Sequence, residues 1–377
     1  MPADSRATRL RSFLKAAVAL VAINLAVLLA LLVPIELIFG NWIRPMALRD
    51  LTRFSIPIAV SFEIDTSALY SGGPRNPIKY SRDAWGLRGS FASLADVDLI
   101  TVGGSTTDQR YLDDLATWQA VAQRELEQKG RRLVVVNAGV DGQSTVGHAF
   151  NFRYWFPLLN GLHPKIVLFY LGANDVLRRE DRAEYDESVD ATSWRVRSAT
   201  YQLIRLVRGN VRARSVGVVH GRMPPMAPSD FTEKGLLAEA EKTVLARQMT
   251  DDILSRIKEL EQNVAAMGAV PIFMTQTAFA WNADRTTPRG LKNIVRVHGR
   301  TMNYADVAFL HQTLNRVLLG HCAEARLTCF DMANEVAFDV GDYYDFLHNT
   351  PRGAEKIGAY LAGRLAELDM TSIGLRK

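Results

Sequence analysis

The stretch VDLITVGGSTT at residues 97–107 decides the fold of this chain. It begins with a short, mostly apolar run, Val97–Val102, and ends in two glycines, a serine and two threonines. A run of this kind is typical of a strand that is buried on both faces of a parallel sheet. Ligands of such sheets bind outside the carboxyl ends of the strands. The stretch therefore predicts a parallel sheet with a functional site at the end of this strand.

Four further apolar runs repeat the pattern, at Leu133–Asn137, Ile166–Leu171, Val270–Thr275 and Leu327–Asp331. Helix-length segments alternate with them, at Thr117–Lys129, Val146–Leu159, Gly235–Met267 and Asn303–Leu319, and a last one follows Pro351. Thr350 is the expected N-cap of that last helix, because proline favours the first helical position. The alternation predicts an α/β fold, a three-layer α/β/α domain around a five-stranded parallel sheet.

Residues that can perform chemistry follow three of these runs. Ser105 follows the first run, a turn ending at Gly142 follows the second, and Asn174 follows the third. Asp345 and His348 stand in the last loop, before the final helix. Because the carboxyl ends of parallel strands meet at one edge of the sheet, we expect these residues to lie together.

This set of residue types suits serine-based acyl transfer. The hydroxyl of Ser105 needs a base to become a nucleophile, and His348 can take its proton near neutral pH. Asp345 can hold the ring of His348 in the required tautomer. The backbone N–H groups of Ser105 and Gly142 and the side chain of Asn174 are the expected oxyanion donors.

The blocks that carry these residues resemble those of the SGNH hydrolase superfamily, the GDSL-like lipases and acylhydrolases. The resemblance covers roughly residues 95–365 and places the family motifs as follows: the nucleophile at Ser105, N-A-x-x-x-G ending at Gly142, G-x-N-D at Gly172, Asn174 and Asp175, and D-x-x-H at Asp345 and His348. The family's first block usually reads G-D-S, and in this chain Gly104 replaces the aspartate. The resemblance implies the same five-stranded sheet and an acyl-enzyme mechanism.

The segment YSRDAWGLRG at residues 80–89 resembles a stretch that precedes the first block in membrane-anchored bacterial members, a subgroup often linked with cell-surface glycans. This favours hydrolysis of a small, acetyl-type ester on a cell-envelope glycan. Transfer of the acyl group to a polysaccharide hydroxyl is the alternative, and lipid esters come third. A protein of a different class, a non-catalytic glycan-binding scaffold for envelope-assembly partners, would be expected to have lost at least one matched catalytic residue.

The N-terminal segment 13–39 is apolar enough to be a transmembrane anchor. Between Ala16 and Ile35 only Asn24 is polar, and about 20 such residues span a bilayer core. A cleaved signal peptide usually has a shorter apolar region and an A-x-A-like site, and a buried core helix is the third interpretation. We therefore expect a cytoplasmic tail at 1–12, an anchor at 13–39, a stem at 40–90 and a hydrolase domain at 91–377. The basic residues before the anchor predict an inner-membrane protein with a periplasmic catalytic domain.

Cys322 and Cys329 are the only two cysteines of the chain. In an oxidising compartment they could form a disulfide, and otherwise they would be two small buried side chains. The exported topology favours the disulfide.

An insertion at about 178–234 separates the third run from the fourth. Residues 191–229 contain no acidic residue, and seven arginines alternate there with apolar residues. This segment could lie on anionic lipid head groups, contact an acidic polymer or cover the active site, and it could also be an ordinary solvated helix face.

Several other classes of function lack support in the sequence. There is no G-x-S-x-G, no P-loop, no G-x-G-x-x-G and no H-E-x-x-H, so an α/β-hydrolase, a nucleotide-binding protein and a zincin are not indicated. The net charge of +5 is too small to indicate nucleic-acid binding, and no nucleic-acid-binding signature is present. We expect no metal and no cofactor.

Overall fold

The five apolar runs form one parallel sheet in the computed structural model of the protein. The strands are β3 (Leu99–Gly103), β4 (Val135–Asn137), β5 (Ile166–Tyr170), β7 (Val270–Met274) and β11 (Thr328–Phe330). Their spatial order is β11-β7-β5-β3-β4, and every pairing within this sheet is parallel. The prediction of a five-stranded parallel sheet is confirmed.

The structure describes residues 3–43, 46–177, 194–216, 222, 224–282 and 284–369. The chain divides into two compact units. One comprises residues 1–46 and 189–218, and the other comprises residues 47–188 and 219–377.

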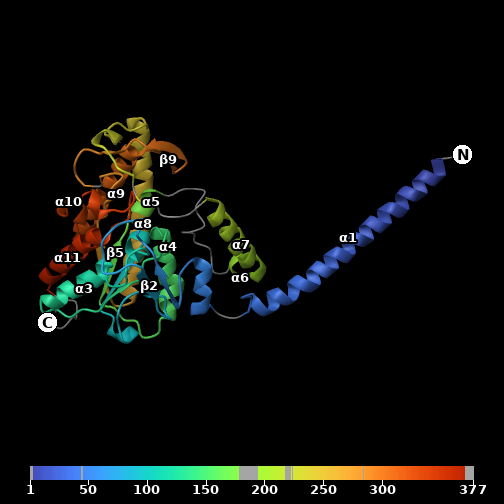
Figure 1. Ribbon diagram of the computed structural model, residues 1–377, viewed down its shortest axis with the longest axis horizontal. Coiled ribbons are helices and arrows are strands. Elements are labelled where there is room, and N and C mark those ends of the chain that lie inside the picture. The colour runs from blue at the N-terminus through green and yellow to red at the C-terminus, as the bar shows by residue number, and fades with distance from the viewer. Residues whose placement is uncertain are drawn as a thin grey trace. The chain divides into compact units, whose positions relative to one another are not determined.

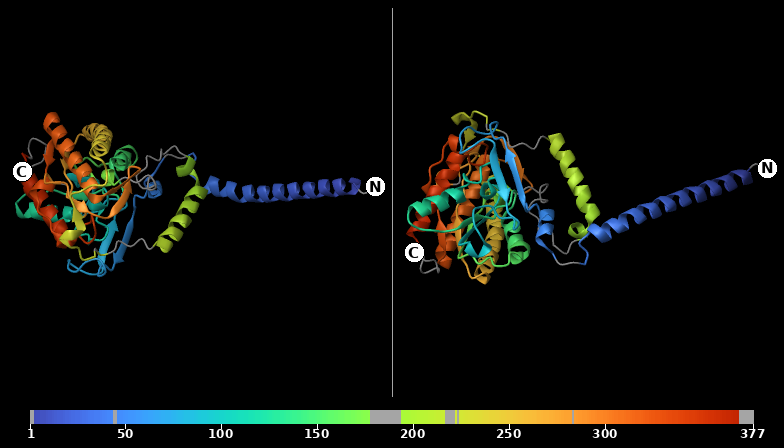
Figure 2. Two further views of the ribbon diagram at one scale, coloured as in Figure 1. Left: turned by 90° about the horizontal axis from the view of Figure 1, so that it is seen from above. Right: turned by 60° about the horizontal axis from the view of Figure 1, so that its bottom comes forward.

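One face of the sheet is covered by α3 (Trp118–Gln128) and α11 (Pro351–Glu367), which pack against each other. Alternate strand residues such as Leu99, Leu168 and Ile272 join side chains of these two helices in one buried apolar cluster. This alternation follows from the strand geometry, which sends successive side chains to opposite faces. Both views of Figure 2 show α11 in red beside α3 in cyan-green.

The opposite face is covered by α4 (Thr145–Phe150), α8 (Glu239–Ala266) and α9 (Tyr304–Ala325). Phe169 in β5 points to this side, where its ring lies 6.0 Å from that of Phe152 and 5.0 Å from that of Phe273. Figure 1 shows α4 and α8 on one side of the sheet and α3 and α11 on the other, which is the three-layer arrangement expected.

The helix starts agree with the sequence signals. Thr117, Asn303 and Thr350 are N-caps whose side chains accept hydrogen bonds from backbone N–H groups of the first turn. The expected single helix at 146–159 is instead α4, a π-helical segment Asn151–Trp155 and a 3-10 turn Phe156–Leu158. Pro157 cannot donate a backbone hydrogen bond, so a regular helix cannot continue through this segment unchanged.

Shorter elements complete the larger unit. The helices are α2 (Ser105–Asp108), α5 (Ala173–Val176) and α10 (Met332–Glu335). Antiparallel pairs join β1 (Val60–Ile64) to β2 (Ile78–Arg82), β6 (Phe231–Thr232) to β8 (Gly290–Leu291), and β9 (Ile294–Val297) to β10 (Arg300–Asn303). The remaining 3-10 turns are Leu48–Phe54, Leu94–Asp96, Pro228–Asp230 and Val340–Asp342.

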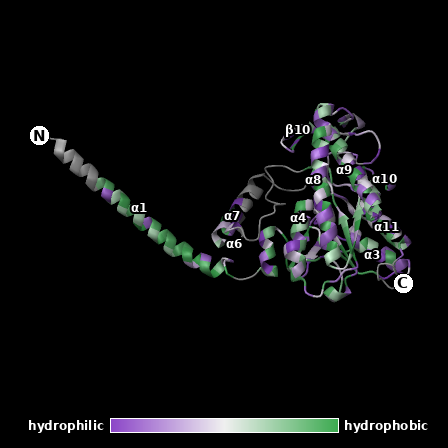
Figure 3. Ribbon diagram, turned by 180° about the vertical axis from the view of Figure 1, so that it is seen from behind, coloured by the Kyte–Doolittle hydropathy of each residue, from purple (hydrophilic) through white to green (hydrophobic). Residues whose placement is uncertain are grey.

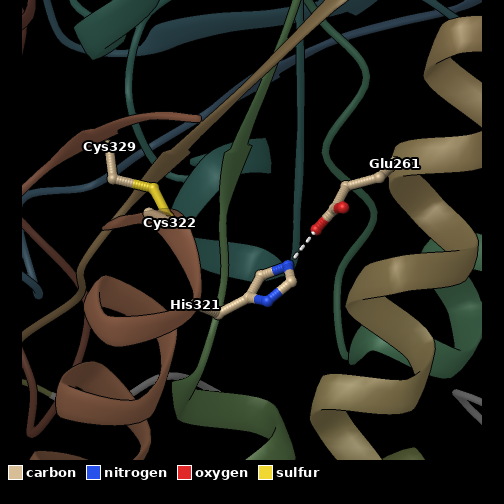
Figure 4. Close-up of a disulfide and its surroundings, with 4 residues drawn as sticks. All are labelled: Glu261, His321, Cys322 and Cys329. Atoms are coloured by element: carbon tan, nitrogen blue, oxygen red, sulfur yellow. Dashed lines mark hydrogen bonds and ion pairs between the residues drawn. A yellow bond between two sulfur atoms is a disulfide. The ribbon is translucent and has the colours of Figure 1, made fainter. Parts of the chain in front are cut away.

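A disulfide between Cys322 and Cys329 connects the end of α9 to β11 (Figure 4). Next to it, His321 lies 2.6 Å from a carboxylate oxygen of Glu261, which joins α9 to α8. Both contacts hold the edge strand β11 and its preceding helix against the rest of the domain.

The smaller unit contains α1 (Ala3–Phe39), α6 (Trp194–Arg197) and α7 (Ala199–Val216). Residues Phe13–Phe39 of α1 form a continuous apolar helix that is not buried against any other part of the described chain. Figure 3 shows this helix coloured as hydrophobic along most of that length. A helix that is apolar all round is typical of a membrane span, although a signal sequence has the same property.

The expected domain boundaries remain predictions. The predicted stem at 40–90 includes the β1–β2 hairpin, which belongs to the larger unit together with the sheet. Of the Arg-rich insertion, residues 178–193, 217–221 and 223 lie outside the described residues. The same holds for residues 1–2, and nothing is described of the side chains of residues 3–12 in the predicted tail.

Candidate active site

Ser105 lies where the strand order changes direction. The chain passes from β3 to its neighbour β4 and then returns to the other side of β3 to form β5. The loops after β4 and β5 therefore separate at the end of β3, which opens a space for a ligand. Ser105 is the first residue of α2 and stands directly above this point.

The structure brings Ser105, His348 and Asp345 together from opposite ends of the domain sequence. The Oγ of Ser105 lies 2.7 Å from Nε2 of His348. On the other side of the ring, Nδ1 lies 2.8 Å and 3.0 Å from the two carboxylate oxygens of Asp345. With the ring proton on Nδ1, the ring donates to Asp345 and accepts from the Ser105 hydroxyl.

The loop before α11 holds this acid and base in place. The backbone N–H groups of Leu347 and His348 donate to Oδ1 of Asp345, at 2.9 Å and 2.7 Å. The ring of Tyr344 stacks on the ring of His348 with a centroid separation of 5.7 Å. The carboxylate and the imidazole therefore cannot reorient independently of this loop.

The surroundings of His348 act on its pKa in opposite directions. Burial lowers the pKa of the ring, but the charge and hydrogen bonds of Asp345 raise it more, so that the pKa lies above 6.5. The side chains of His348 and Asp345 are only 14% and 18% exposed, so the effect of Asp345 is weakly screened by water. A histidine in this state is a stronger base than a free imidazole.

The three expected oxyanion donors come from the start of α2, from the loop after β4 and from α5 after β5. The N–H of Ser105 opens the first turn of α2, where backbone N–H groups have no acceptor inside the helix. Gly142 adopts a left-handed backbone with φ of 78°, which favours glycine at this turn. Nδ2 of Asn174 donates to the carbonyl of Gln143 at 2.8 Å, and an amide nitrogen has a second hydrogen for a further acceptor.

The structure gives a reason for glycine at position 104. A Cβ on Gly104 would lie 2.2 Å from Nδ2 of Asn174 and 2.8 Å from the carbonyl oxygen of Gln143. Both distances are shorter than a non-bonded contact allows. The absence of a side chain at 104 therefore lets the Asn174 amide approach the turn that carries Ser105.

Asp175 of the third motif holds two loops of the site together. Its carboxylate accepts from the backbone N–H and, at 2.5 Å, from the hydroxyl of Thr145, and Arg256 of α8 lies 3.8 Å away. It thereby fastens the start of α4, and the loop after β4 that leads into it, next to the loop after β5.

A small pocket opens beside the nucleophile. Its free volume, including the part open to solvent, is about 210 Å³. Gly104, Asn174 and Leu347 are among the residues that line it.

The sequence analysis missed a buried ion pair behind the nucleophile turn. Arg82, at the end of β2, donates to Asp108 at 2.6 Å and also to the backbone carbonyl of Gly139. The hydroxyl of Tyr80 lies between them, 2.8 Å from Arg82 and 3.0 Å from Asp108. Since Asp108 is the last residue of α2, this cluster connects the β1–β2 hairpin to the helix that begins with Ser105.

Two more side chains fix the same turn. Arg88 is fully buried and donates to the carbonyls of Asp108 and Gln109, at 2.6 Å and 2.9 Å. Asn137, the first residue of the N-A-x-x-x-G motif, donates to the carbonyl of Thr107 at 2.6 Å. Arg82 and Arg88 lie in the segment at 80–89, whose resemblance to membrane-anchored family members gave no structural role for either arginine.

No group of three or more histidine, cysteine, aspartate or glutamate side chains that could hold a metal ion occurs among the described residues. A hydroxyl, an imidazole oriented by a carboxylate and hydrogen-bond donors are the kinds of group that serine-based acyl transfer requires.

Comparison with known proteins agrees with this arrangement. The sequence model of the GDSL-like Lipase/Acylhydrolase family matches residues 101–356. This range contains every site residue predicted from the sequence, from Ser105 to His348. No curated protein sequence matches the chain significantly.

Several solved structures match the chain at low sequence identity. A member of the lipolytic G-D-S-L family from Veillonella parvula is 12% identical, with 72% of this chain and 100% of that chain covered and a TM-score of 0.40. A carbohydrate acetylesterase from Sinorhizobium meliloti is 10% identical, with 72% and 98% covered and a TM-score of 0.40. An aryl esterase from M. smegmatis is 13% identical, with 72% and 99% covered and a TM-score of 0.42.

Proposed function

The chain belongs to the GDSL-like lipase/acylhydrolase family and is an esterase or acylhydrolase, and from this premise we propose that it removes a small acyl group from a cell-envelope glycan through an acyl-enzyme on Ser105. The observation that carries the proposal is the hydrogen-bonded series Ser105–His348–Asp345, with contacts of 2.7 Å and 2.8 Å. A nucleophile within reach of a base that is itself oriented by a carboxylate is the arrangement that serine acyl transfer requires.

In the first half-reaction, Oγ of Ser105 attacks the carbonyl carbon of the ester while its proton moves to Nε2 of His348. The carbonyl oxygen becomes an oxyanion, which accepts hydrogen bonds from the N–H groups of Ser105 and Gly142 and from the amide of Asn174. Losing one such donor typically costs about 2.7–4 kcal/mol of transition-state stabilisation. The C–O bond to the alcohol then breaks, and His348 returns its proton to the leaving alkoxide.

In the second half-reaction, water takes the place of the alcohol. His348 removes a proton from this water, whose oxygen attacks the acyl carbon. The bond between that carbon and Oγ of Ser105 then breaks, His348 returns the proton to Oγ, and a carboxylic acid is released. A polysaccharide hydroxyl at the same place would give acyl transfer instead.

We propose a short acyl group, whose carbonyl would lie at the pocket lined by residues that include Gly104, Asn174 and Leu347. The glycan part of the proposal depends on the resemblance of the segment at 80–89 to membrane-anchored members of the family. The apolar helix at 13–39 supports a membrane location, and we propose the extracytoplasmic side of the inner membrane from the basic residues before it.

The test is to compare the purified full-length chain with its Ser105→Ala variant. We expect wild-type protein to hydrolyse p-nitrophenyl acetate, to label with a fluorophosphonate and to release acetate from an O-acetylated envelope polysaccharide. In Ser105→Ala labelling should be absent and kcat should fall by about 10⁴- to 10⁶-fold, while the melting temperature stays the same. Thr107→Ser, which alters a neighbouring hydroxyl of the same turn, serves as the matched control and should keep its labelling.

Three outcomes separate the parts of the proposal. Turnover retained in Ser105→Ala would exclude this serine as the nucleophile. Activity on butyrate and longer esters that exceeds activity on acetate would exclude the short-acyl assignment. Acetylated oligosaccharide products in place of free acetate would identify transfer to a sugar hydroxyl.

A further inference from the structure

The junction between α1 and α7 contains a carboxylate that the catalytic site does not use. Glu36 lies near the end of α1, immediately after the apolar run that ends at Ile35. One of its oxygens accepts from the hydroxyl of Ser198 at 2.7 Å and from the N–H of Thr200 at 2.9 Å. The other accepts from the N–H of Ala199 and from the indole of Trp42, both at 3.0 Å.

These contacts fix the start of α7 at the end of the apolar helix. The first N–H groups of a helix have no intrahelical acceptor, and the helix dipole favours a negative charge there. Glu36 supplies that charge from 163 residues away in sequence, as the separation from Ala199 shows. The N–H of Asn41 also donates to the carbonyl of Arg197, at 2.8 Å, which joins the chain after α1 to α6.

The described part of α7 presents apolar side chains that the protein itself does not cover. Leu203, Ile204 and Val207 lie on one side of the helix and are 57%, 49% and 53% exposed. Trp194 in α6 is 57% exposed, and its ring contacts that of Tyr201 at 5.4 Å. Tryptophan and tyrosine are enriched at the membrane–water interface.

Positive charge accompanies these apolar residues. Arg195, Arg205 and Arg208 lie in the same two helices, and residues 191–229 contain no acidic residue. Apolar side chains together with arginines on one short helix are the pattern of a helix in the membrane interface. An acidic polymer would use the arginines but would leave Leu203, Ile204 and Val207 exposed to water.

We propose that α7 lies in the head-group layer of the membrane that α1 crosses, on the side where α1 ends, with Leu203, Ile204 and Val207 toward the acyl chains and the arginines on anionic lipid phosphates. The Glu36 contacts set the depth of the helix, because they place its first turn at the boundary of the span. The proposal rests on α1 as an uncleaved anchor, and it does not depend on the substrate of the catalytic site.

The experiment uses the full-length chain in nanodiscs of phosphatidylcholine and phosphatidylglycerol. A nitrobenzoxadiazole label is placed on Val207→Cys and, as a matched control, on Val244→Cys of α8, which is 56% exposed in the wild type. A third label on Leu25→Cys reports the anchor. The native cysteines are joined to each other and do not react when no reductant is present.

We expect lipid carrying a 5-doxyl nitroxide to quench the label at 207 by more than about half and the label at 244 by little, with the label at 25 also quenched. Arg205→Glu together with Arg208→Glu should reduce quenching at 207 in anionic nanodiscs and leave quenching at 25 unchanged.

Quenching at 25 with none at 207 would overturn the proposal while leaving the anchor in place. No quenching at either position would overturn both the anchor and the interfacial helix. A label at 207 that responds to an added acidic polysaccharide and not to lipid would also overturn the proposal, in favour of a polymer-binding helix. Acetyl-ester turnover, measured on the same samples, reports the catalytic site separately.

Discussion

Asp108 and Glu36 are two carboxylates that hold helices in different ways. Asp108 closes the short helix that begins with Ser105, and it is buried against a guanidinium, Arg82, at 2.6 Å. Glu36 holds the start of α7 through four neutral donors at 2.7–3.0 Å. In the first region the charge is neutralised inside the fold. In the second it is balanced by hydrogen bonds and a helix dipole.

The two carboxylates also lie in surroundings that differ in how far their apolar side chains are buried. The catalytic unit buries its apolar side chains on both faces of the sheet, and its nucleophile turn is fixed by contacts from three other segments. The smaller unit leaves uncovered the apolar span Phe13–Phe39 of α1 and, in the described part of α7, Leu203, Ile204 and Val207. The protein itself supplies hydrogen-bond partners for its polar groups. A contiguous exposed apolar surface, in contrast, is stabilised only when a membrane or another apolar partner covers it. The first region should therefore function without lipid, whereas the second should respond to lipid.

After Ser105→Ala, the largest effect is expected from Asp345→Asn in the catalytic unit. The neutral amide loses the charge that stabilises the protonated ring and favours the wrong tautomer, so kcat/KM should fall by about 10⁴-fold. The measurement is ester turnover with and without lipid. If the loss of turnover depended on lipid, the prediction that the catalytic unit functions without lipid would be wrong.

The same pair sets the pH dependence. His348 must be neutral to accept the proton of Ser105, and Asp345 raises its pKa above 6.5. Wild-type kcat/KM should therefore fall as pH decreases through that raised pKa and should level off above it. In Asp345→Asn the midpoint of the acid limb should move to lower pH, because the largest contribution that raises the pKa of His348 against burial is then lost and only the more weakly acting Asp141 and Asp108 remain. A midpoint that stays unchanged would remove Asp345 as the cause.

Arg82→Ala should have the next largest effect. It leaves Asp108 buried without its cation, which typically costs about 3–5 kcal/mol in the free energy of unfolding. Denaturant unfolding of the catalytic unit checks this value, and Arg82→Lys should restore part of it. Because Asp108 ends the helix that starts at Ser105, kcat should fall more than KM changes. If stability fell but kcat in the folded fraction did not, Arg82 would have no role in positioning the nucleophile turn.

Removal of the disulfide should have a smaller effect. The cysteines are seven positions apart, and closing so short a loop contributes about 2–3 kcal/mol in the chain-entropy treatment. Cys322→Ser with Cys329→Ser should lower the free energy of unfolding by this amount while retaining turnover at 25 °C. Full alkylation of the wild-type thiols without reductant, in protein from its native compartment, would contradict both the disulfide and the exported location.

Gly104→Ala should reduce kcat by about tenfold, because the new Cβ displaces the Asn174 amide from the oxyanion side of the site. KM should change less, since the pocket keeps its other walls. Asn174→Ala is the comparison variant, and the double variant should be little worse than Asn174→Ala alone. Additive effects of the two substitutions would mean that Gly104 acts independently of Asn174.

The smallest effect is expected from Glu36→Gln in the smaller unit. Loss of a charge at a helix start weakens the first turn by about 1 kcal/mol, so amide exchange at Ala199 and Thr200 should become about fivefold faster. Hydrolysis of a soluble acetyl ester should not change. A loss of turnover in Glu36→Gln would show that the contacts of Glu36 affect the catalytic unit, which would contradict the independence of the two regions.

Much of the fold could be predicted because its signals are local. The runs at Val97–Val102 and Ile166–Leu171 became β3 and β5 within two residues at each end, since continuous apolar runs suit strands buried on both faces. The cap at Thr350 depends on a side chain next to the backbone group that it satisfies. The segment at 146–159 was mispredicted as one helix, because periodicity does not distinguish α from π and 3-10 winding.

The sequence by itself determined the order of strands and helices, the residue types at the strand ends and the apolar character of residues 13–39, because each depends on neighbours along the chain. Only the tertiary structure decided that Arg82 meets Asp108, that Gly104 makes room for Asn174 and that Glu36 holds the start of α7. Those contacts join residues 26, 70 and 163 positions apart. No local pattern encodes such pairings, since a buried charge or a missing side chain gains its meaning only from the group that the fold places against it.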